Sequence, residues 1–272
     1  MAFRILFWNI ENYSGDPART QTLVQHIQAN SPDIVGFSEI RDKAALRSIL
    51  QDSLNDYDFG ITDGREGIEL LAGWKRGLFA QALFTQRREF KSGNPFLRPG
   101  SLLSVKRDGT FHNVLFLHTD SGRKNSDYLN RQDMFERVWS LRLKLDEIEG
   151  GTSRFLALGD LNTMGRKASG TNPAISADEE IANLGSDAQQ NGMHLLNKSH
   201  PNTWARVNDQ GQITLQSNLD HVLISDSVPL VNIATGQEVL VRGWVDATTD
   251  ASRHDFVEGV SDHCSIEIVV DA

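Results

Sequence analysis

The segment RFLALGDLN, residues 154–162, is the stretch of sequence that decides the fold. Its first part is a short apolar run, which predicts a buried β-strand. Asp160 and Asn162 follow at the point where that strand should end. Near the C-terminus, Ser261-Asp262-His263 stands directly before the last predicted strand. Polar side chains at strand ends are either turn and cap residues or members of a site, and the rest of the chain has to decide between these.

Strands and helices are mixed on both sides of this segment. We expect strands at about 3–9, 33–39, 70–75, 78–86, 102–106, 111–117, 154–159, 219–224, 239–244 and 265–270. We expect helices at about 16–30, 42–54, 127–149 and 176–191, and a loop at 165–178. The strands between 70 and 117 have hairpin spacing, and Ile148 belongs to the predicted apolar stripe of the third helix. The pattern predicts sheets covered by helices in one domain, residues 1–272.

The composition narrows the class of protein. Of 272 residues, 39% are apolar, which allows a substantial core. No apolar run reaches the roughly 18 residues that a membrane span needs, so we expect none. Cys264 is the single cysteine, which excludes an intrachain disulfide and a cysteine zinc cluster. A reducing, cytoplasmic location is therefore expected, whereas nothing in the sequence indicates the oligomeric state.

The net charge of −9 argues against a protein that binds nucleic acid by charge alone. The charge is unevenly distributed, however. Residues 65–107 contain nine Lys or Arg and three Asp or Glu, a local balance of +6, so the remainder carries −15. This basic segment either faces an anionic substrate or forms solvated strand and loop surfaces.

Several polar residues share a position at or near a predicted strand end. They are Asn9, Glu39, His118, Asp160, Asp220, Asp262 and His263. Magnesium needs only one or two carboxylates, and the four acids in this set supply them. An amide such as Asn9 or Asn162 donates to a phosphate oxygen without adding negative charge. His118 and His263 are candidates for general acid and base.

The motifs around these residues resemble those of the endonuclease/exonuclease/phosphatase superfamily, in the same order along the chain. They are Trp8-Asn9-Ile10-Glu11, residues 32–39 (PDIVGFSE), Gly159-Asp160-Leu161-Asn162, Leu219-Asp220-His221 and Ser261-Asp262-His263-Cys264. They span residues 8–264. Any one of them is weakly specific, but five in register are hard to attribute to chance. The resemblance implies a four-layer α/β/β/α sandwich of two packed mixed β-sheets with helices on the outer faces.

The resemblance also implies roles for individual residues. Glu39 would bind catalytic Mg²⁺ or Mn²⁺, with Glu11 and Asp262 as further metal-site residues. Asp160 would orient or deprotonate the attacking water. Asn9, Asn162 and His263 would contact the phosphate of the substrate. Asp220 would hold a residue of the site in place.

Three features distinguish this chain within the family. The deoxyribonuclease I-like and sphingomyelinase-like branches have a histidine at the position of His118, and this chain resembles them there. The abasic-site repair branch has a tyrosine at that position. Ser38 stands where a glutamine is common. His221 replaces a frequent aromatic residue, and we expect it to pack or to support the site.

Other residues are candidates with weaker support. Arg98, in the basic segment, has the geometry to clamp a phosphate or to pair at a sheet edge. Arg123 and Lys124 are either substrate contacts or ordinary loop residues. The tryptophans at 74, 204 and 244 are expected in the core rather than stacked on a base.

The predicted reaction is hydrolysis of a phosphoester with a divalent metal and an activated water. The favoured substrate is DNA or RNA, cleaved at its phosphodiester bonds. A small-molecule or lipid head-group phosphoester is the alternative. A non-catalytic binding protein on the same scaffold is the third hypothesis, which the intact acidic and histidine residues disfavour.

Overall fold

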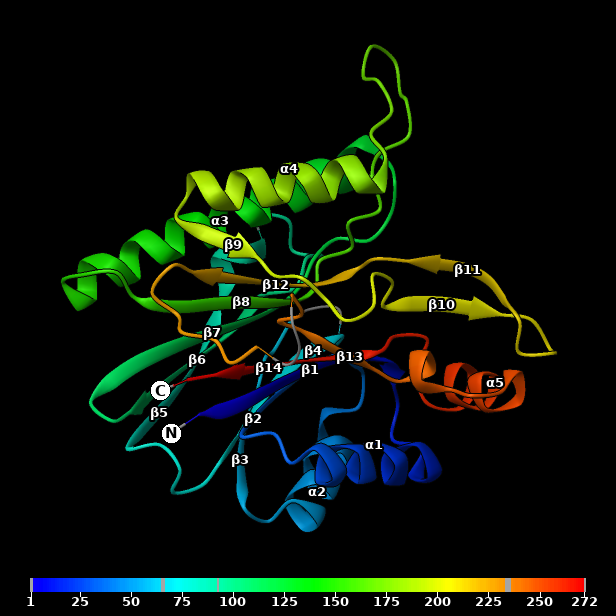
Figure 1. The fold of residues 1–272 in the computed structure, drawn as a ribbon, viewed down its shortest axis with the longest axis horizontal. Helices are drawn as coiled ribbons and strands as arrows, with labels where there is room; N and C mark the ends of the chain where they lie inside the picture. The colour runs from blue at the N-terminus through cyan, green and yellow to red at the C-terminus, as the bar shows by residue number, and fades with distance from the viewer. Residues whose placement is uncertain (1, 65–66, 92, 233–235, 272) are drawn as a thin grey trace.

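The structure, a computed structural model, describes residues 2–64, 67–91, 93–232 and 236–271, except the side chain of Ile49. Arg65, the first residue of the basic segment, lies outside the described residues. Two six-stranded sheets form the centre of the molecule (Figure 1). The first contains β1 (Phe3–Tyr13), β2 (Ile34–Ile40), β3 (Tyr57–Ile61), β4 (Glu69–Lys75), β13 (Leu240–Arg242) and β14 (Ser265–Val270). The second contains β5 (Gln81–Arg87), β6 (Gly100–Arg107), β7 (Thr110–His118), β8 (Arg154–Asp160), β9 (Met193–Leu195) and β12 (Asp220–Ser225).

Both sheets are mixed. The strand orders are β13-β14-β1-β2-β4-β3 and β5-β6-β7-β8-β12-β9. One pair in each sheet is parallel, β1 with β2 and β7 with β8, and the other pairs are antiparallel. A small hairpin of β10 (Trp204–Val207) and β11 (Ile213–Ser217) stands apart from both sheets.

Helices cover the outer face of each sheet, which confirms the predicted four-layer sandwich (Figure 1). α1 (Pro17–Asn30) and α2 (Lys43–Ser53) cover the first sheet, and α3 (Asn125–Glu149) and α4 (Ala177–Gln190) cover the second. Asp16 caps α1 through the backbone N–H of Arg19 and Pro17 occupies its first turn, as the sequence predicts. The described helices include none that is long and apolar enough to cross a membrane.

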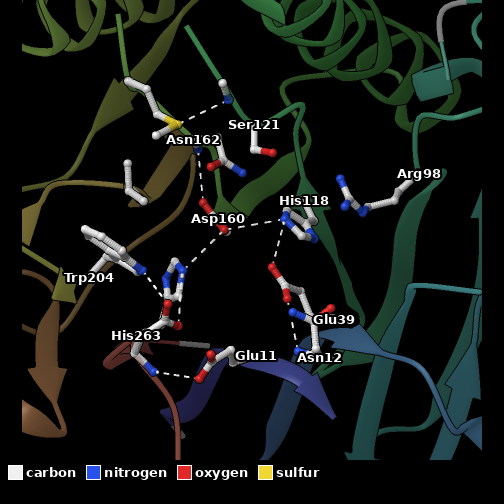
Figure 2. A pocket seen from close by; sticks show the side chains of 14 residues that line it. Glu11, Asn12, Glu39, Arg98, His118, Ser121, Asp160, Asn162, Trp204 and His263 are labelled. Carbon is white, nitrogen blue, oxygen red and sulfur yellow. Dashed lines mark hydrogen bonds and ion pairs between the residues drawn. The ribbon is translucent and has the colours of Figure 1, made fainter. Parts of the chain in front are cut away.

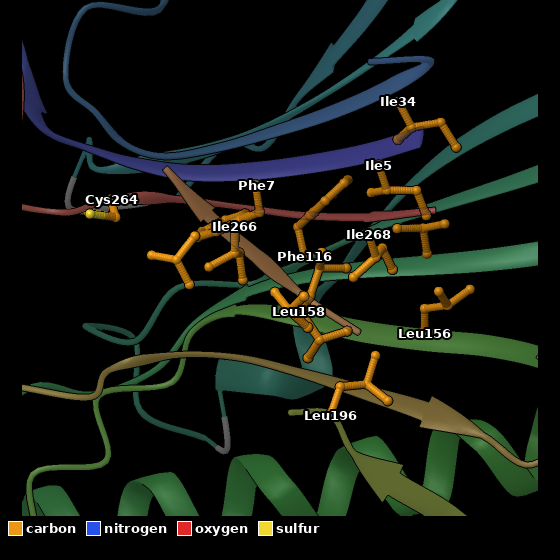
Figure 3. Close-up of a cluster of buried hydrophobic side chains, with 14 of the residues drawn as sticks. Ile5, Phe7, Ile34, Phe116, Leu156, Leu158, Leu196, Cys264, Ile266 and Ile268 are labelled. Carbon is orange, nitrogen blue, oxygen red and sulfur yellow. The ribbon is translucent and has the colours of Figure 1, made fainter. Parts of the chain in front are cut away.

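The central core lies between the two sheets and is built by their inward-facing alternate residues (Figure 3). Phe7 of β1 and Phe116 of β7 meet across the interface with their rings stacked, 6.0 Å between centroids. Gly36 makes room for this contact, because a Cβ there would lie 2.3 Å from the Phe116 ring. Burying side chains of this size contributes roughly 1.5–3 kcal/mol each, so this layer is the main source of stability.

Several expectations about local structure are wrong. β4 and β5 do not form a hairpin, because the chain crosses from one sheet to the other between them, with Gly77 in a left-handed conformation (φ 71°). Ile148 is 79% exposed rather than buried, whereas Trp139 packs inward. Neither the β10–β11 hairpin nor α5 (Asp250–Gly259) is among the predicted elements. Val257 is the buried residue of α5, so its sequence carries little apolar periodicity.

Candidate active site

Neighbouring strands bring the predicted site residues to one end of the sheets. β7 and β8 run parallel, and their register places His118 beside Asp160. β12 runs antiparallel to β8 and places Asp220 on the other side of Asp160. In the facing sheet, Asn9 of β1 lies beside Ser38 of β2, directly before Glu39. The register of strand pairing within each sheet therefore brings the polar ends of these strands to the same place.

Gly159 permits the close approach of β7 and β8 at this point. Its φ is 155°, and a Cβ would lie 1.9 Å from the carbonyl oxygen of Leu117. No side chain fits there without moving the backbone of the strand that carries His118. The glycine of the Gly-Asp-Leu-Asn motif is thus explained by the contact that sets the spacing of His118 and Asp160.

Left-handed backbone conformations at non-glycine residues gather at the site. Glu11, Asn12, Glu39 and Asn162 have φ between 40° and 63°. Such conformations cost on the order of 1 kcal/mol or more each and persist where the surrounding structure imposes them. Here they turn the carboxylates of Glu11 and Glu39 and the amide of Asn162 toward a common pocket.

His263 and Asp220 form a buried pair. His263 Nδ1 lies 2.8 Å from Asp220 Oδ2, and Asp160 Oδ2 lies 3.7 Å from His263 Nε2. Burial opposes the charged imidazole, but the carboxylates of Asp220 and Asp160 outweigh it and raise the pKa of His263 to about 10. His263 is therefore charged at neutral pH, with Asp220 fixing its orientation.

His118 has the opposite electrostatic character. Burial, together with the charges of Arg98 and His263, holds its pKa well below the ordinary value. Its Nε2 lies 3.5 Å from Asp160 Oδ2 and 3.6 Å from Glu39 Oε1. The site thus combines a neutral histidine and a charged histidine on the two sides of one carboxylate, which is an arrangement suited to acid–base chemistry.

Asn9 organises the carboxylates rather than lining the pocket. Its Nδ2 donates to Asp160 Oδ2 at 2.9 Å and to Glu39 Oε1 at 3.1 Å. Both amide hydrogens are used in this way. Direct contact of Asn9 with a phosphate, as expected from the sequence, would require one of these bonds to break. Asn162 differs, because its Nδ2 makes one bond, to Thr119 O at 3.2 Å, and keeps a hydrogen for a ligand.

The acidic side of the site suits a hard cation. Burial raises the pKa of Glu11 to about 7, and the negative charge of Asp262 adds to this effect. Asp262 Oδ1 is buried and has no hydrogen-bond partner among the described residues. Carboxylate atoms that repel one another and lack donors are relieved by a bound metal ion.

Among the residues that the structure describes, two groups of side chains meet the spacing of a metal site. Glu39, His118 and Asp160 have ligand atoms within 4.8 Å of one another, and so do Asp160, Asp220 and His263. Glu11 and Asp262 belong to neither group, although both line the same pocket. The residues predicted as metal ligands are therefore brought to one place, but as a spread set around Glu39 rather than as a tight triad.

The pocket between these side chains has a volume of about 420 Å³ (Figure 2). Its lining residues are Glu11, Asn12, Glu39, Arg98, His118, Ser121, Gly122, Asp160, Asn162, Met164, Trp204, Leu219, Asp262 and His263. Asp220 lies behind His263 and does not reach the pocket. The lining combines carboxylates with cationic and amide groups, as a phosphate and a metal together require.

Arg98 lies beside His118 in this pocket (Figure 2). Its Nε is buried, and no hydrogen bond or ion pair to its guanidinium occurs within the described part of the chain. Burial lowers the pKa of Arg98 from its ordinary value, against the opposing charges of Glu39 and Asp160. A buried guanidinium without a partner is an expected feature of an anion site.

The other candidates fall outside the pocket. His221 is buried, with Nε2 2.8 Å from Thr163 Oγ1, in the supporting position that the sequence predicts. Arg123 and Lys124 directly follow Gly122 and are exposed, but neither lines the pocket.

One pocket residue was expected elsewhere. Trp204 was predicted to be a core residue, but it lines the pocket and donates from Nε1 to Asp262 Oδ2 at 2.5 Å. The sequence offers little indication of this. Trp204 begins a strand of the small hairpin, and nothing in the sequence around it distinguishes it from the buried Trp244.

The fold and the site together are those of a phosphoester hydrolase. The sequence profile of the Endonuclease/Exonuclease/phosphatase family matches residues 6–263, and the chain belongs to this family. A search of curated protein sequences gave no significant match.

Solved structures share the fold at low sequence identity. TDP2 from C. elegans superposes with a TM-score of 0.68 at 14% identity, over 100% of this chain and 75% of that one. D. rerio TDP2 complexed with single-strand DNA product gives 0.63 at 15% identity, over 100% and 99%. The 3′ phosphatase NExo (D146N) from Neisseria, bound to a product DNA hairpin, superposes with a TM-score of 0.65 at 16% identity. The match covers 99% of this chain and 100% of that one.

Proposed function

We propose that the protein is a Mg²⁺- or Mn²⁺-dependent phosphodiesterase, a nuclease that cleaves phosphodiester bonds of DNA or RNA. One observation carries this proposal: a neutral histidine, His118, and a charged histidine, His263, flank the buried Asp160 in a pocket that Arg98 and further acids also line. Residues 1–272 act as one catalytic domain in this account.

The metal would be held by Glu39, with Glu11 and Asp262 as neighbouring oxygen donors. A bound divalent ion polarises the phosphoryl oxygen and neutralises developing negative charge. The short carboxylate spacing at Asp160 and the unpartnered oxygen of Asp262 support a cation at this place. Magnesium keeps several waters, so a spread set of acids is sufficient.

The chain's own residues supply the remaining functions. Asp160 lies between the two histidines and is placed to orient the attacking water. His118 is neutral and offers a proton acceptor, whereas His263 is charged and directs Nε2 at the phosphate side of the site. Asn162 and Arg98 donate to phosphate oxygens. Donors fixed in this way stabilise a transition state without reorganising.

Nucleic acid is the favoured substrate. The pocket contains a partly exposed aromatic ring, Trp204, on which a base can stack. Two similar structures hold DNA, D. rerio TDP2 with a single-strand product and NExo with a hairpin. The net charge of −9 implies that affinity comes from local contacts such as Arg98 rather than from the overall field.

A small-molecule or lipid head-group phosphoester is the second candidate, since Arg98, His263 and a metal suffice to bind a single phosphate. A binding protein without activity is the third, and its support is weak because the chain keeps Glu39, Asp160, Asn162, Asp262 and His263.

A substrate panel tests the proposal. The protein is incubated with Mg²⁺ or Mn²⁺ and single-stranded DNA, plasmid DNA, RNA or bis-p-nitrophenyl phosphate. We expect cleavage of at least one polymer. Cleavage of the small diester alone would replace the nuclease by the small-molecule hypothesis, and inertness with every substrate and metal would favour the binding protein.

A further inference from the structure

A buried ion pair outside the pocket joins four separate parts of the chain. Arg131 of α3 and Glu180 of α4 are both fully buried. They bond in a two-pronged manner, Nε to Oε1 at 2.8 Å and Nη2 to Oε2 at 2.9 Å. Resting on the function proposed above, we propose that this pair is a positioning device for the active site and that it acts on the reaction through Asn162.

The pair binds both loops that leave the catalytic strands. Arg131 Nη1 donates to the carbonyl oxygens of Asp120 at 3.2 Å and Gly122 at 2.8 Å, in the loop after His118. Nη2 donates to Gly165 O at 2.9 Å, in the loop after Asn162. The two loops are therefore fixed to one guanidinium.

Glu180 completes the attachment of the second loop. Its Oε2 accepts from the backbone N–H of Gly165 at 2.7 Å, so the pair binds both polar backbone groups of this residue. Gly165 has a φ of 72°, and a Cβ there would lie 2.3 Å from Ile175 O. The loop thus has a single tight path, with its buried backbone groups satisfied by the ion pair.

These loops form one wall of the pocket. Ser121, Gly122 and Met164 line it, and Gly122 N donates to Met164 Sδ at 3.2 Å. The first loop also bonds to the catalytic residues. Thr119 N donates to Asp160 O at 3.0 Å, and Thr119 O accepts from Asn162 Nδ2 at 3.2 Å.

The orientation of the Asn162 amide therefore depends on where the loop beginning at Thr119 lies. Arg131 holds that loop at Asp120 and Gly122, one and three residues further on. Displacing a catalytic donor by about 1 Å is enough to lower a rate by about 100-fold. Arg131 is accordingly a positioning residue, because it touches neither the pocket nor the proposed reacting groups.

Arg142 provides a matched control on the same helix. It pairs with Asp146 at 3.0 Å and donates Nη1 to Asn191 O at 2.8 Å, so it also ties α3 to the end of α4. Within the described part of the chain, Arg142 forms no hydrogen bond or ion pair with either of the two loops. Losing Arg142 removes a comparable link between the same helices without touching the pocket wall.

The first test does not depend on activity. Hydrogen exchange is compared among wild type, Arg131→Met/Glu180→Leu and Arg142→Met. Replacing both members of a buried pair by apolar residues is usually compatible with folding; Arg131→Lys, which keeps the charge, is the reserve variant. We expect faster exchange in 119–124 and 163–167 together, with the strands of both sheets unchanged. Unchanged exchange in either loop, or the same change in Arg142→Met, would overturn the proposal.

The second test asks whether Arg131 acts through Asn162. We expect Arg131→Met/Glu180→Leu to lower kcat by about 10- to 100-fold, and Arg131→Lys, which keeps the charge beside Glu180, to retain more activity. In the Asn162→Ala background, the same double substitution should cost less than about 2-fold, since interacting residues are not additive. Fully additive losses would contradict the proposal. If wild type cleaves no phosphoester, the proposed function fails, and exchange alone decides the positioning role.

Discussion

Asp220 Oδ2 lies 2.8 Å from His263 Nδ1, and both side chains are buried, Asp220 at the start of β12 and His263 just before β14. The two residues are 43 positions apart, and Asp220 itself does not line the pocket. The carboxylate nevertheless contributes to catalysis in our account, because it keeps the imidazole charged and turns Nε2 toward the substrate.

Asp220→Asn tests this relationship. Asparagine keeps the shape but removes the charge that holds the proton on His263, so we expect kcat to fall by about 100-fold or more while the fold persists. Asp226→Asn is the control, because Asp226 forms an exposed pair with His194 at 2.8 Å. Turnover of Asp220→Asn within a few-fold of the control would show that the dyad is not needed.

Arg98 should contribute substrate affinity. Arg98→Met removes from the pocket a guanidinium whose buried Nε has no hydrogen-bond partner among the described residues. We expect KM to rise by about 10-fold or more, since a charged hydrogen bond is worth roughly 1.5–3 kcal/mol. Arg98→Lys should recover part of this loss. Arg76→Met, from the same basic segment but paired with Asp58 at 2.8 Å, should have no effect on KM. Equal KM values for Arg98→Met and Arg76→Met would refute the assignment.

Two substitutions of Trp204 separate stacking from hydrogen bonding. Trp204→Phe removes the donor to Asp262 but keeps a ring, whereas Trp204→Ala removes both. If the ring stacks on a base, Trp204→Ala should raise KM for an oligonucleotide by about 5- to 100-fold, and Trp204→Phe much less. KM for bis-p-nitrophenyl phosphate should respond little to the loss of base stacking. Indistinguishable oligonucleotide KM values for the two variants would exclude stacking.

The positions of the candidate site residues could largely be predicted from the sequence. Asp160, His118 and Asp220 follow or begin apolar strands, and pairing register then brings strand ends together. The family match over residues 6–263 and the two-sheet fold confirm the resemblance. These predictions succeeded because they rest on a local pattern, an apolar strand followed by a polar residue at its end.

Features that depend on distant contacts could not be predicted. The Arg131–Glu180 pair joins residues 49 positions apart, and each looks like an ordinary surface charge of an amphipathic helix. The crossing between β4 and β5 resembles a hairpin in sequence, because a glycine turn joins two apolar strands in both cases. Sheet assignment is decided by which faces bury one another, and a single sequence carries little information about that.

His112 makes stability depend on pH at a position remote from the site. Burial, with the charges of Arg154 and Arg107, lowers its pKa to about 4, and it packs edge-on against Phe3 at 5.0 Å. The unfolded chain binds this proton more readily than the folded protein. Its contribution to stability is therefore complete above about pH 6.5 and is lost as the pH falls toward 4.

His112→Gln removes this titration. Denaturant unfolding from pH 7 to 4 should show a shallower loss of free energy of unfolding in the variant than in wild type, by up to about 3 kcal/mol. His194→Gln, at an exposed position, is the control. Parallel pH profiles for wild type and His112→Gln would contradict the prediction.

In the function proposed above, the protein hydrolyses a phosphodiester with a metal ion and with Asp160, the buried carboxylate between two histidines. The most direct measurement is the rate of phosphodiester cleavage by wild type, Asp160→Asn and His263→Ala, each with Mg²⁺, with EDTA, and with Mg²⁺ restored. We predict that EDTA abolishes wild-type cleavage, that Mg²⁺ restores it, and that both variants lose most activity while remaining folded. Cleavage that survives EDTA, or near-normal turnover in either variant, would contradict the account.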